Sequence, residues 1–165
     1  MKILYYGGQK SGKSLLAEKM TIKLSKDKKP YYIATYNNIY DDKEMHQRIL
    51  THKTQRQDNF ITIEEPYDLN KVIEDNNYYL VDCISMWILN SLNKPLDTIL
   101  DELNTLLIRE DISVVFVLND VNSGVIPMDR ESREYVDRCG IIGQKIASMS
   151  DKVYSVTLGI ARELK

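Results

Sequence analysis

The sequence predicts an α/β fold, a three-layer sandwich in which helices cover both faces of a mostly parallel central sheet. Apolar runs typical of strands alternate with longer helix-like segments along the whole chain. The first run, residues 2–6, leads directly into a glycine-containing turn and then a helical pattern. The 165 residues include no repeat or linker that would mark a boundary. We therefore expect a single domain over residues 1–165.

The turn after the first strand carries a phosphate-binding pattern. Residues 7–14 match G-x-x-x-x-G-K-[ST]. Glycine at positions 7 and 12 lets backbone amides surround phosphate oxygens, lysine at 13 contacts the β- and γ-phosphates, and serine at 14 reaches Mg²⁺. A glycine-rich turn without a ligand is the alternative, but the flanking strand and helix count against it. We predict a P-loop NTPase-type fold that binds a nucleoside triphosphate through Gly7, Gly8, Gln9, Lys10, Ser11, Gly12, Lys13 and Ser14.

The next elements follow in order. Residues 13–25 read as a helix with Leu15, Leu16, Met20 and Leu24 toward the core. Its N-terminus would direct a partial positive charge at the bound phosphates. Strands are expected at 31–35, after Pro30, and at 60–64. Between them, residues 41–57 are polar and predict a helix, with Asp41 or Asp42 as N-cap.

The second half of the chain continues the alternation. A short helix at 69–74 precedes residues 78–83, a continuous apolar run suited to a central parallel strand. Helices follow at 85–92 and 96–109. Residues 113–118 are rich in β-branched side chains and predict a strand. A long helix over 129–149 then leads to a last strand at 152–157.

Asp82 ends the run Tyr79-Leu80-Val81-Asp82, four residues that resemble a Walker B strand. The carboxyl ends of parallel strands meet at one edge of the sheet, which is where such folds bind ligands. A carboxylate there can hold Mg²⁺ beside the phosphate loop, so Ser14 and Asp82 are the candidate metal residues. The alternative is a buried strand that happens to end in an acid.

Residues 119–127, after the next strong strand, are rich in turn formers and could form either a substrate loop or a surface connection. They lack the N-K-x-D signature that reads guanine in regulatory GTPases. This absence argues against a switch GTPase.

The composition excludes several classes of protein. A net charge of −2 and the lack of a basic, aromatic-studded tract argue against nucleic-acid binding. No stretch is long and apolar enough for a signal peptide or a membrane span. Cys83 and Cys139 form no C-x-x-C pair, and we expect reduced, buried thiols in a cytoplasmic protein rather than a disulfide.

Both histidines fall in the polar segment at 41–57. His46 and His52 are six residues apart, so they would point to different faces of a helix and make a poor zinc pair. His52 has Arg48 and Arg56 one turn away and Lys53 beside it. A histidine among cations could attack a phosphoryl centre, but an exposed histidine on a charged helix is the simpler reading.

Several separated motifs make the whole chain resemble the bifunctional adenosylcobinamide kinase / adenosylcobinamide-phosphate guanylyltransferase family of cobalamin biosynthesis. The resemblance rests on the phosphate loop, on Arg48-Ile49-Leu50-Thr51-His52-Lys53, and on the block from Val81 to Asn90, which reads V-D-C-I-S-M-W-I-L-N. It extends through Asn119-Asp120, Gly124-Val125-Ile126-Pro127 and the helix that holds Arg130, Gly140, Gln144 and Ala147.

The resemblance implies a two-step transferase. GTP or ATP, with Mg²⁺, phosphorylates adenosylcobinamide, a corrinoid, and GMP from GTP then passes to adenosylcobinamide phosphate through a guanylyl-histidine. It makes His52 catalytic together with Lys13, implies a trimer, and extends the nucleotide contacts beyond the phosphate loop. The additional contacts are Ala34, Thr35, Tyr36, Lys53, Thr54, Gln55, Arg56, Glu64 and Asp82. Glu64 could instead be a structural carboxylate at a strand end.

Two rival functions stay open at this point. A simple P-loop small-molecule kinase would never become covalently nucleotidylated, and a non-catalytic nucleotide-dependent binding module would bind GTP without turnover. His52 and its basic neighbours argue against the first, and the lack of a recognisable partner-binding appendage argues against the second.

Overall fold

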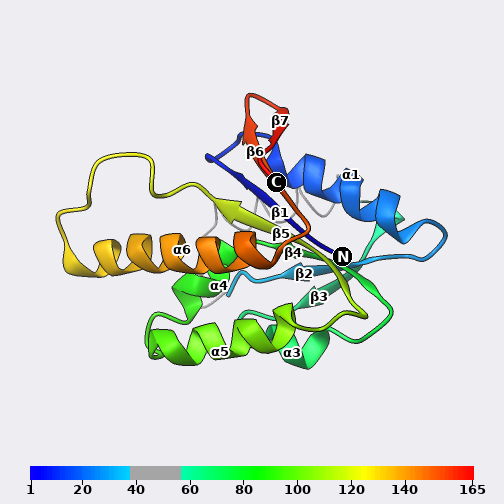
Figure 1. Ribbon diagram of the computed structural model, residues 1–165, viewed down its shortest axis with the longest axis horizontal. Coiled ribbons are helices and arrows are strands. Elements are labelled where there is room, and N and C mark those ends of the chain that lie inside the picture. Colours follow the sequence, from blue (N-terminus) through cyan, green and yellow to red (C-terminus); the bar gives the residue numbers. More distant parts are fainter. Residues whose placement is uncertain (38–56) are drawn as a thin grey trace.

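Seven strands form one sheet in the computed structural model, which describes residues 1–37 and 57–165 (Figure 1). Their order is β3-β2-β4-β5-β1-β6-β7. Every neighbouring pair from β3 to β6 is parallel, and β7 runs antiparallel to β6. The strands are β1 Lys2–Gly7, β2 Tyr31–Ala34, β3 Ile61–Glu64, β4 Tyr78–Asp82, β5 Ser113–Asn119, β6 Lys152–Thr157 and β7 Ile160–Glu163. The predicted mostly parallel sheet is therefore confirmed.

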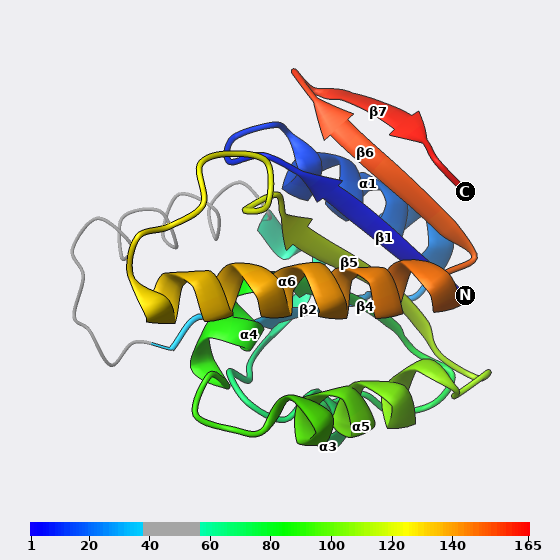
Figure 2. The same cartoon turned by 60° about the vertical axis from the view of Figure 1, so that its left-hand side comes forward.

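Helices cover both faces of this sheet (Figures 1 and 2). The helix α1, Lys13–Ser25, lies on one face. The other face carries α3 Leu69–Val72, α4 Ile84–Asn90, α5 Leu96–Leu107 and α6 Arg130–Met149. A short 3-10 helix, η2 Gln57–Asn59, precedes β3. The molecule has the predicted three-layer α/β architecture.

The central strands are buried on both sides, which explains why the sequence marks them so clearly. Val114 to Leu118 of β5 are all buried, as are Tyr79, Leu80 and Val81 of β4. A parallel strand between two helical layers has no solvent-facing side, so its sequence is continuously apolar. These runs are the ones that predict strands at 78–83 and 113–118.

Small residues bring α1 close to the sheet. Ala17 and Thr21 are fully buried at i, i+4 spacing, and the Thr21 hydroxyl donates to the Ala17 carbonyl at 2.8 Å. The expected core contacts of Leu16, Met20 and Leu24 are confirmed, because all three are partly buried and pack against the core of this face. The prediction for Leu15 is wrong. Leu15 is 56% exposed because the side of the helix that faces the sheet is the one with Ala17 and Thr21, and Leu15 lies on another side.

The hairpin of β6 and β7 is absent from the sequence-based prediction, which made residues 152–157 the last strand. All four residues of β7 are exposed, so the sequence has no apolar pattern that would predict this strand. The two-residue loop, Leu158 and Gly159, has φ of 53° and 78°. Type I′ hairpin turns require positive φ at both loop positions, usually at Asn-Gly. Because leucine is atypical at the first position, the sequence does not predict this turn.

The helix predicted at 41–57 lies outside the described residues, except for Gln57, which begins η2. Within the described part of the chain, no helix is long and apolar enough to cross a membrane.

Candidate nucleotide-binding site

The phosphate loop connects β1 to α1 at the carboxyl edge of the sheet. The Ser11 amide donates to the Gly8 carbonyl at 3.2 Å, and Lys10 and Gly12 have positive φ of 56° and 94°. These turns fold the loop around a hollow of about 340 Å³, which is lined by Gln9, Lys10, Ser11, Gly12, Lys13, Ser14 and Leu15. Because α1 begins at Lys13, the first amides of the helix lie at the phosphate loop without partners inside the helix. Such amides are the donors that an anion site requires.

The loop packs against the β6–β7 hairpin. A Cβ on Gly7 would lie 2.4 Å from the Val156 carbonyl oxygen, and a Cβ on Gly12 would lie 3.0 Å from the Gly159 Cα. The Gly159 amide donates to the Ser11 carbonyl at 2.8 Å. The β6–β7 hairpin, which the sequence did not predict, thus packs directly against the phosphate loop.

Lys13 brings a buried positive charge into the loop. The residue is only 6% exposed, and its Nζ donates to the Gly8 carbonyl at 3.1 Å. Burial lowers the pKa of the ammonium, and the nearby Asp82 carboxylate opposes that shift. An ammonium has three N–H donors, so donors beyond the one given to Gly8 can reach phosphate oxygens.

Asp82 lies at the end of β4, with one carboxylate oxygen held by a neighbour. The buried Tyr32 hydroxyl donates to Asp82 Oδ2 at 3.0 Å. A carboxylate and the Ser14 hydroxyl supply the hard oxygen ligands that Mg²⁺ prefers, and Mg²⁺ commonly takes only one or two protein ligands beside phosphates and waters. Among the described residues, no cluster of three or more His, Cys, Asp or Glu side chains could hold a metal alone. The donor set fits a nucleotide-bound Mg²⁺ rather than a protein-caged metal.

A buried polar network joins the ends of β2, β4 and β5. The Thr35 hydroxyl donates to the Cys83 carbonyl at 2.7 Å and accepts from the Cys83 amide at 3.0 Å. The Asn90 amide group donates to the carbonyls of Thr35 at 2.7 Å and Pro66 at 3.0 Å. The Ser85 hydroxyl accepts from the backbone N–H of Asn119 at 2.8 Å. Ser85 and Asn90 of α4 therefore hold the end of β5 and the loops after β2 and β3 in place.

Three more of the residues predicted to bind nucleotide lie at the carboxyl edge of the sheet. Ala34 pairs with Asp82 on one side and Glu64 on the other, so these residues end three adjacent strands. Tyr36 follows two residues later and is half-buried. Thr35 is fully buried with its hydroxyl committed to Cys83, so any nucleotide contact from it would come from the backbone. His52, Lys53, Thr54, Gln55 and Arg56 lie outside the described residues.

Neither cysteine suits covalent catalysis. Both are buried and unpaired, which agrees with the expected reduced thiols. Burial raises the pKa of Cys83 to about 12 and that of Cys139 to about 11. The thiolate is the nucleophilic form, so both are unreactive near neutral pH.

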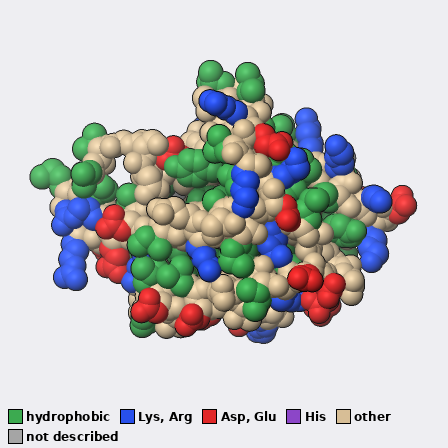
Figure 3. Space-filling view, in the orientation of Figure 1, with side chains coloured by type: hydrophobic (Ala, Val, Ile, Leu, Met, Phe, Trp, Pro, Cys, Tyr) green, Lys and Arg blue, Asp and Glu red, His purple; other side chains and the backbone are tan. Residues whose placement is uncertain are grey.

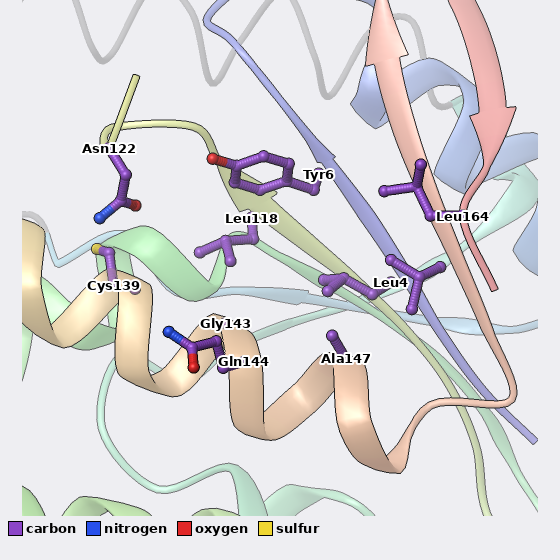
Figure 4. A pocket seen from close by; sticks show the side chains of 11 residues that line it. Leu4, Tyr6, Leu118, Asn122, Cys139, Gly143, Gln144, Ala147 and Leu164 are labelled. Atoms are coloured by element: carbon purple, nitrogen blue, oxygen red, sulfur yellow. The ribbon is translucent and has the colours of Figure 1, made fainter. Parts of the chain in front are cut away.

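An apolar cavity of about 380 Å³ lies on the other face of the sheet, beneath α6 (Figure 4). It is lined by Leu4, Tyr6, Leu118, Asn122, Cys139, Gly140, Gly143, Gln144, Ala147, Val153 and Leu164. Burial and a hydrogen bond to Asp120 raise the pKa of Tyr6 to about 12, so its hydroxyl stays protonated. None of the described residues predicted to bind nucleotide lines this cavity.

The segment between β5 and α6 is an exposed loop. Val125 is 94% exposed and Met128 is 96% exposed. Figure 3 shows hydrophobic side chains at the end of the molecule where this loop projects.

Comparison with known proteins matches one family model, described as cobinamide kinase / cobinamide phosphate guanyltransferase, over residues 3–164. The bifunctional adenosylcobalamin biosynthesis protein CobP of Pseudomonas aeruginosa is 33% identical, with 100% of this chain and 98% of that protein covered. The bifunctional adenosylcobalamin biosynthesis protein CobU of Salmonella typhimurium is 32% identical, with both chains fully covered. Among solved structures, the flagellar accessory protein FlaH of Methanocaldococcus jannaschii is similar with a TM-score of 0.54. It is 16% identical, with 99% of this chain and 77% of that chain covered, and indicates a shared fold only.

The contact between Gly7 and β6 predicts a large difference between two adjacent glycines. Gly7→Ala should lower the free energy of unfolding by about 1–3 kcal/mol, because its Cβ would overlap a backbone carbonyl that cannot rotate away. Gly8→Ala should change it little, since nothing lies within 4 Å of the added Cβ. Urea unfolding of both variants measures the difference, and equal stabilities would contradict the close packing of loop and hairpin.

Proposed function

This chain belongs to the cobinamide kinase / cobinamide phosphate guanyltransferase family, and we propose that it catalyses both reactions at the carboxyl edge of its sheet. It is a transferase of adenosylcobalamin biosynthesis. In the first reaction a hydroxyl of adenosylcobinamide takes the γ-phosphoryl group of GTP or ATP. In the second, adenosylcobinamide phosphate receives GMP from GTP. One unit, residues 1–165, serves both reactions.

The observation that carries this proposal is the buried ammonium of Lys13 inside the phosphate loop. A cation that is 6% exposed, with a lowered pKa, gains most from an anionic ligand at close range. Phosphate oxygens would meet that charge together with the backbone amides of the loop. The same contacts stabilise charge that develops during phosphoryl transfer, which is largely a matter of positioning and electrostatics.

We further propose that Ser14 and Asp82 hold Mg²⁺ when the triphosphate is bound. When bound, the ion neutralises charge on the phosphate oxygens. The proposal is supported by the oxygen donors of these two residues and by the anchored carboxylate of Asp82.

The second reaction proceeds, in our proposal, through His52. A neutral imidazole nitrogen attacks the α-phosphorus of GTP, so that a P–N bond forms as the bond to the bridging oxygen breaks and pyrophosphate leaves. A phosphate oxygen of adenosylcobinamide phosphate then attacks the same phosphorus, and the P–N bond breaks. The family's arginine–isoleucine and histidine–lysine spacing supports His52 over His46. The high pKa values of Cys83 and Cys139 argue against a thiol in this role.

The remaining nucleotide contacts are proposed from the family and from the convergence of strand ends. Ala34, Glu64 and Asp82 end adjacent strands beside the loop, with Thr35 and Tyr36 next in the chain. Lys53, Thr54, Gln55 and Arg56 are proposed from the family pattern alone.

We also propose a trimer in the cytoplasm. The trimer follows from the family resemblance, and the exposed apolar residues Leu158 and Ile160, at 90% and 72%, are compatible with a protein interface. Reduced, buried cysteines are typical of the cytoplasm.

Replacing Lys13 should weaken both activities without unfolding the protein. Lys13→Ala removes a preorganised charge next to the phosphates, and such a loss typically lowers the rate about 10²-fold. Lys19→Ala, on the exposed side of the same helix, is the control and should keep full activity. Steady-state rates of both reactions measure the effect. Wild-type turnover by folded Lys13→Ala would exclude the phosphate loop as the site.

Covalent labelling tests the guanylyl-histidine directly. Incubation with GTP and Mg²⁺ should leave one acid-labile GMP on His52, detected by mass spectrometry of the intact chain and its peptides. His52→Ala should abolish the label and the guanylyl transfer, and it should spare phosphorylation of adenosylcobinamide. His46→Ala is the matched control and should label normally. A label on His46, or an undiminished label on His52→Ala, would contradict the mechanism.

Self-association is tested by mass in solution. Light scattering at micromolar concentration should give about three times the chain mass of 19.2 kDa. A value near that of one chain would rule the trimer out.

A further inference from the structure

Asp82 contacts a side chain of the neighbouring strand β2, on the face of the sheet that carries α1. In the parallel pairing of β2 and β4, Ala34 lies opposite Asp82. Tyr32 lies two residues before Ala34, so its side chain emerges on the same face. Tyr32 is 4% exposed, and its ring packs edge-on against Phe60, with ring centroids 6.1 Å apart. From this fixed position its hydroxyl donates to Asp82 Oδ2 at 3.0 Å.

The peptide that follows Asp82 is held from the same strand. The fully buried Thr35 hydroxyl bonds both the carbonyl and the amide of Cys83. The Thr35 carbonyl is in turn bound by Asn90 of α4. The backbone after Asp82 therefore has little freedom, and the carboxylate itself is left to rotate only about its side-chain torsions.

Rotation of the carboxylate is what the Tyr32 bond restricts. With Oδ2 held by a hydrogen bond to a charged acceptor, which is stronger than a neutral one, the plane of the carboxylate has a preferred orientation. The other oxygen can then be presented to a ligand in one geometry. Hydrogen bonds of this kind orient metal-binding carboxylates, and their removal typically weakens metal affinity 10–100-fold.

We propose that Tyr32 is a positioning residue for Asp82, orienting its carboxylate toward nucleotide-bound Mg²⁺. The inference rests on the proposed function, because it presupposes that Asp82 meets a metal–triphosphate complex. The proposed role of Tyr32 is exerted through Asp82 and involves no contact with the reacting atoms.

The test uses Tyr32→Phe, which removes one oxygen and keeps the ring that packs against Phe60. Tyr79→Phe is the matched control, because Tyr79 is a buried tyrosine of the adjacent strand whose hydroxyl accepts from the Glu74 amide at 2.9 Å, away from the site. The probe is an α,β-methylene analogue of GTP, which cannot lose pyrophosphate. Its binding is measured by calorimetry in EDTA and across a Mg²⁺ titration, with urea unfolding alongside.

Tyr32→Phe should bind the analogue in EDTA as the wild type does, and should need about 10–100-fold more Mg²⁺ to reach its highest affinity. Tyr79→Phe should match the wild type in both conditions. The proposal is overturned if Tyr32→Phe keeps the wild-type Mg²⁺ requirement. It is equally overturned if its affinities with and without Mg²⁺ fall together, which would indicate a structural role only. Failure of the wild type to bind the analogue at all would instead refute the proposed function, and this inference with it.

Discussion

The burial of the Lys13 ammonium is the constraint on which the site depends. A charge in a protein interior must be compensated by oxygen atoms at short range. The Gly8 carbonyl accepts a hydrogen bond from Lys13 Nζ, and the negative charge of Asp82 favours the ammonium form. The loop must therefore bend back on itself, and the end of β4 must lie beside the start of α1. A compact positive centre of this kind, surrounded by backbone amides, is what a triphosphate requires.

The surrounding structure maintains this arrangement through contacts from distant parts of the chain. Gly7 and Gly12 allow the loop to lie against the β6–β7 hairpin, whose Gly159 amide bonds Ser11. On the other side, Tyr32 and Thr35 of the β2 end fix Asp82 and the peptide after it. The helix α4, which begins two residues after Asp82, anchors these loops through its own polar side chains. Direct contacts thus join the phosphate loop to the β6–β7 hairpin, and the Asp82 carboxylate to Tyr32, around the proposed nucleotide site.

The sequence predicts the features that depend on local pattern and misses those created by pairing. The α1 boundaries and the buried strands β4 and β5 follow from the phosphate-binding motif and from apolar runs. The bonds from Tyr32 to Asp82 and from Thr35 to Cys83 join residues 50 and 48 positions apart, so only the alignment of β2 with β4 creates them. The exposed strand β7 and its turn at Leu158 carry no sequence signal. The exposure of the leucines on α1 depends on which side of the helix packs against the sheet, and that side is set by the small residues Ala17 and Thr21.

The central claim, that a triphosphate is bound by the amides of the phosphate loop, is tested most directly by hydrogen–deuterium exchange. Backbone N–H groups of the phosphate loop, residues 7–14, are the proposed ligands, and exchange reports on those groups themselves. With the α,β-methylene GTP analogue and Mg²⁺, exchange should slow strongly in residues 7–14 and at the end of β4. Unchanged exchange in this segment under saturating analogue, with protection confined to other parts of the chain, would contradict the account.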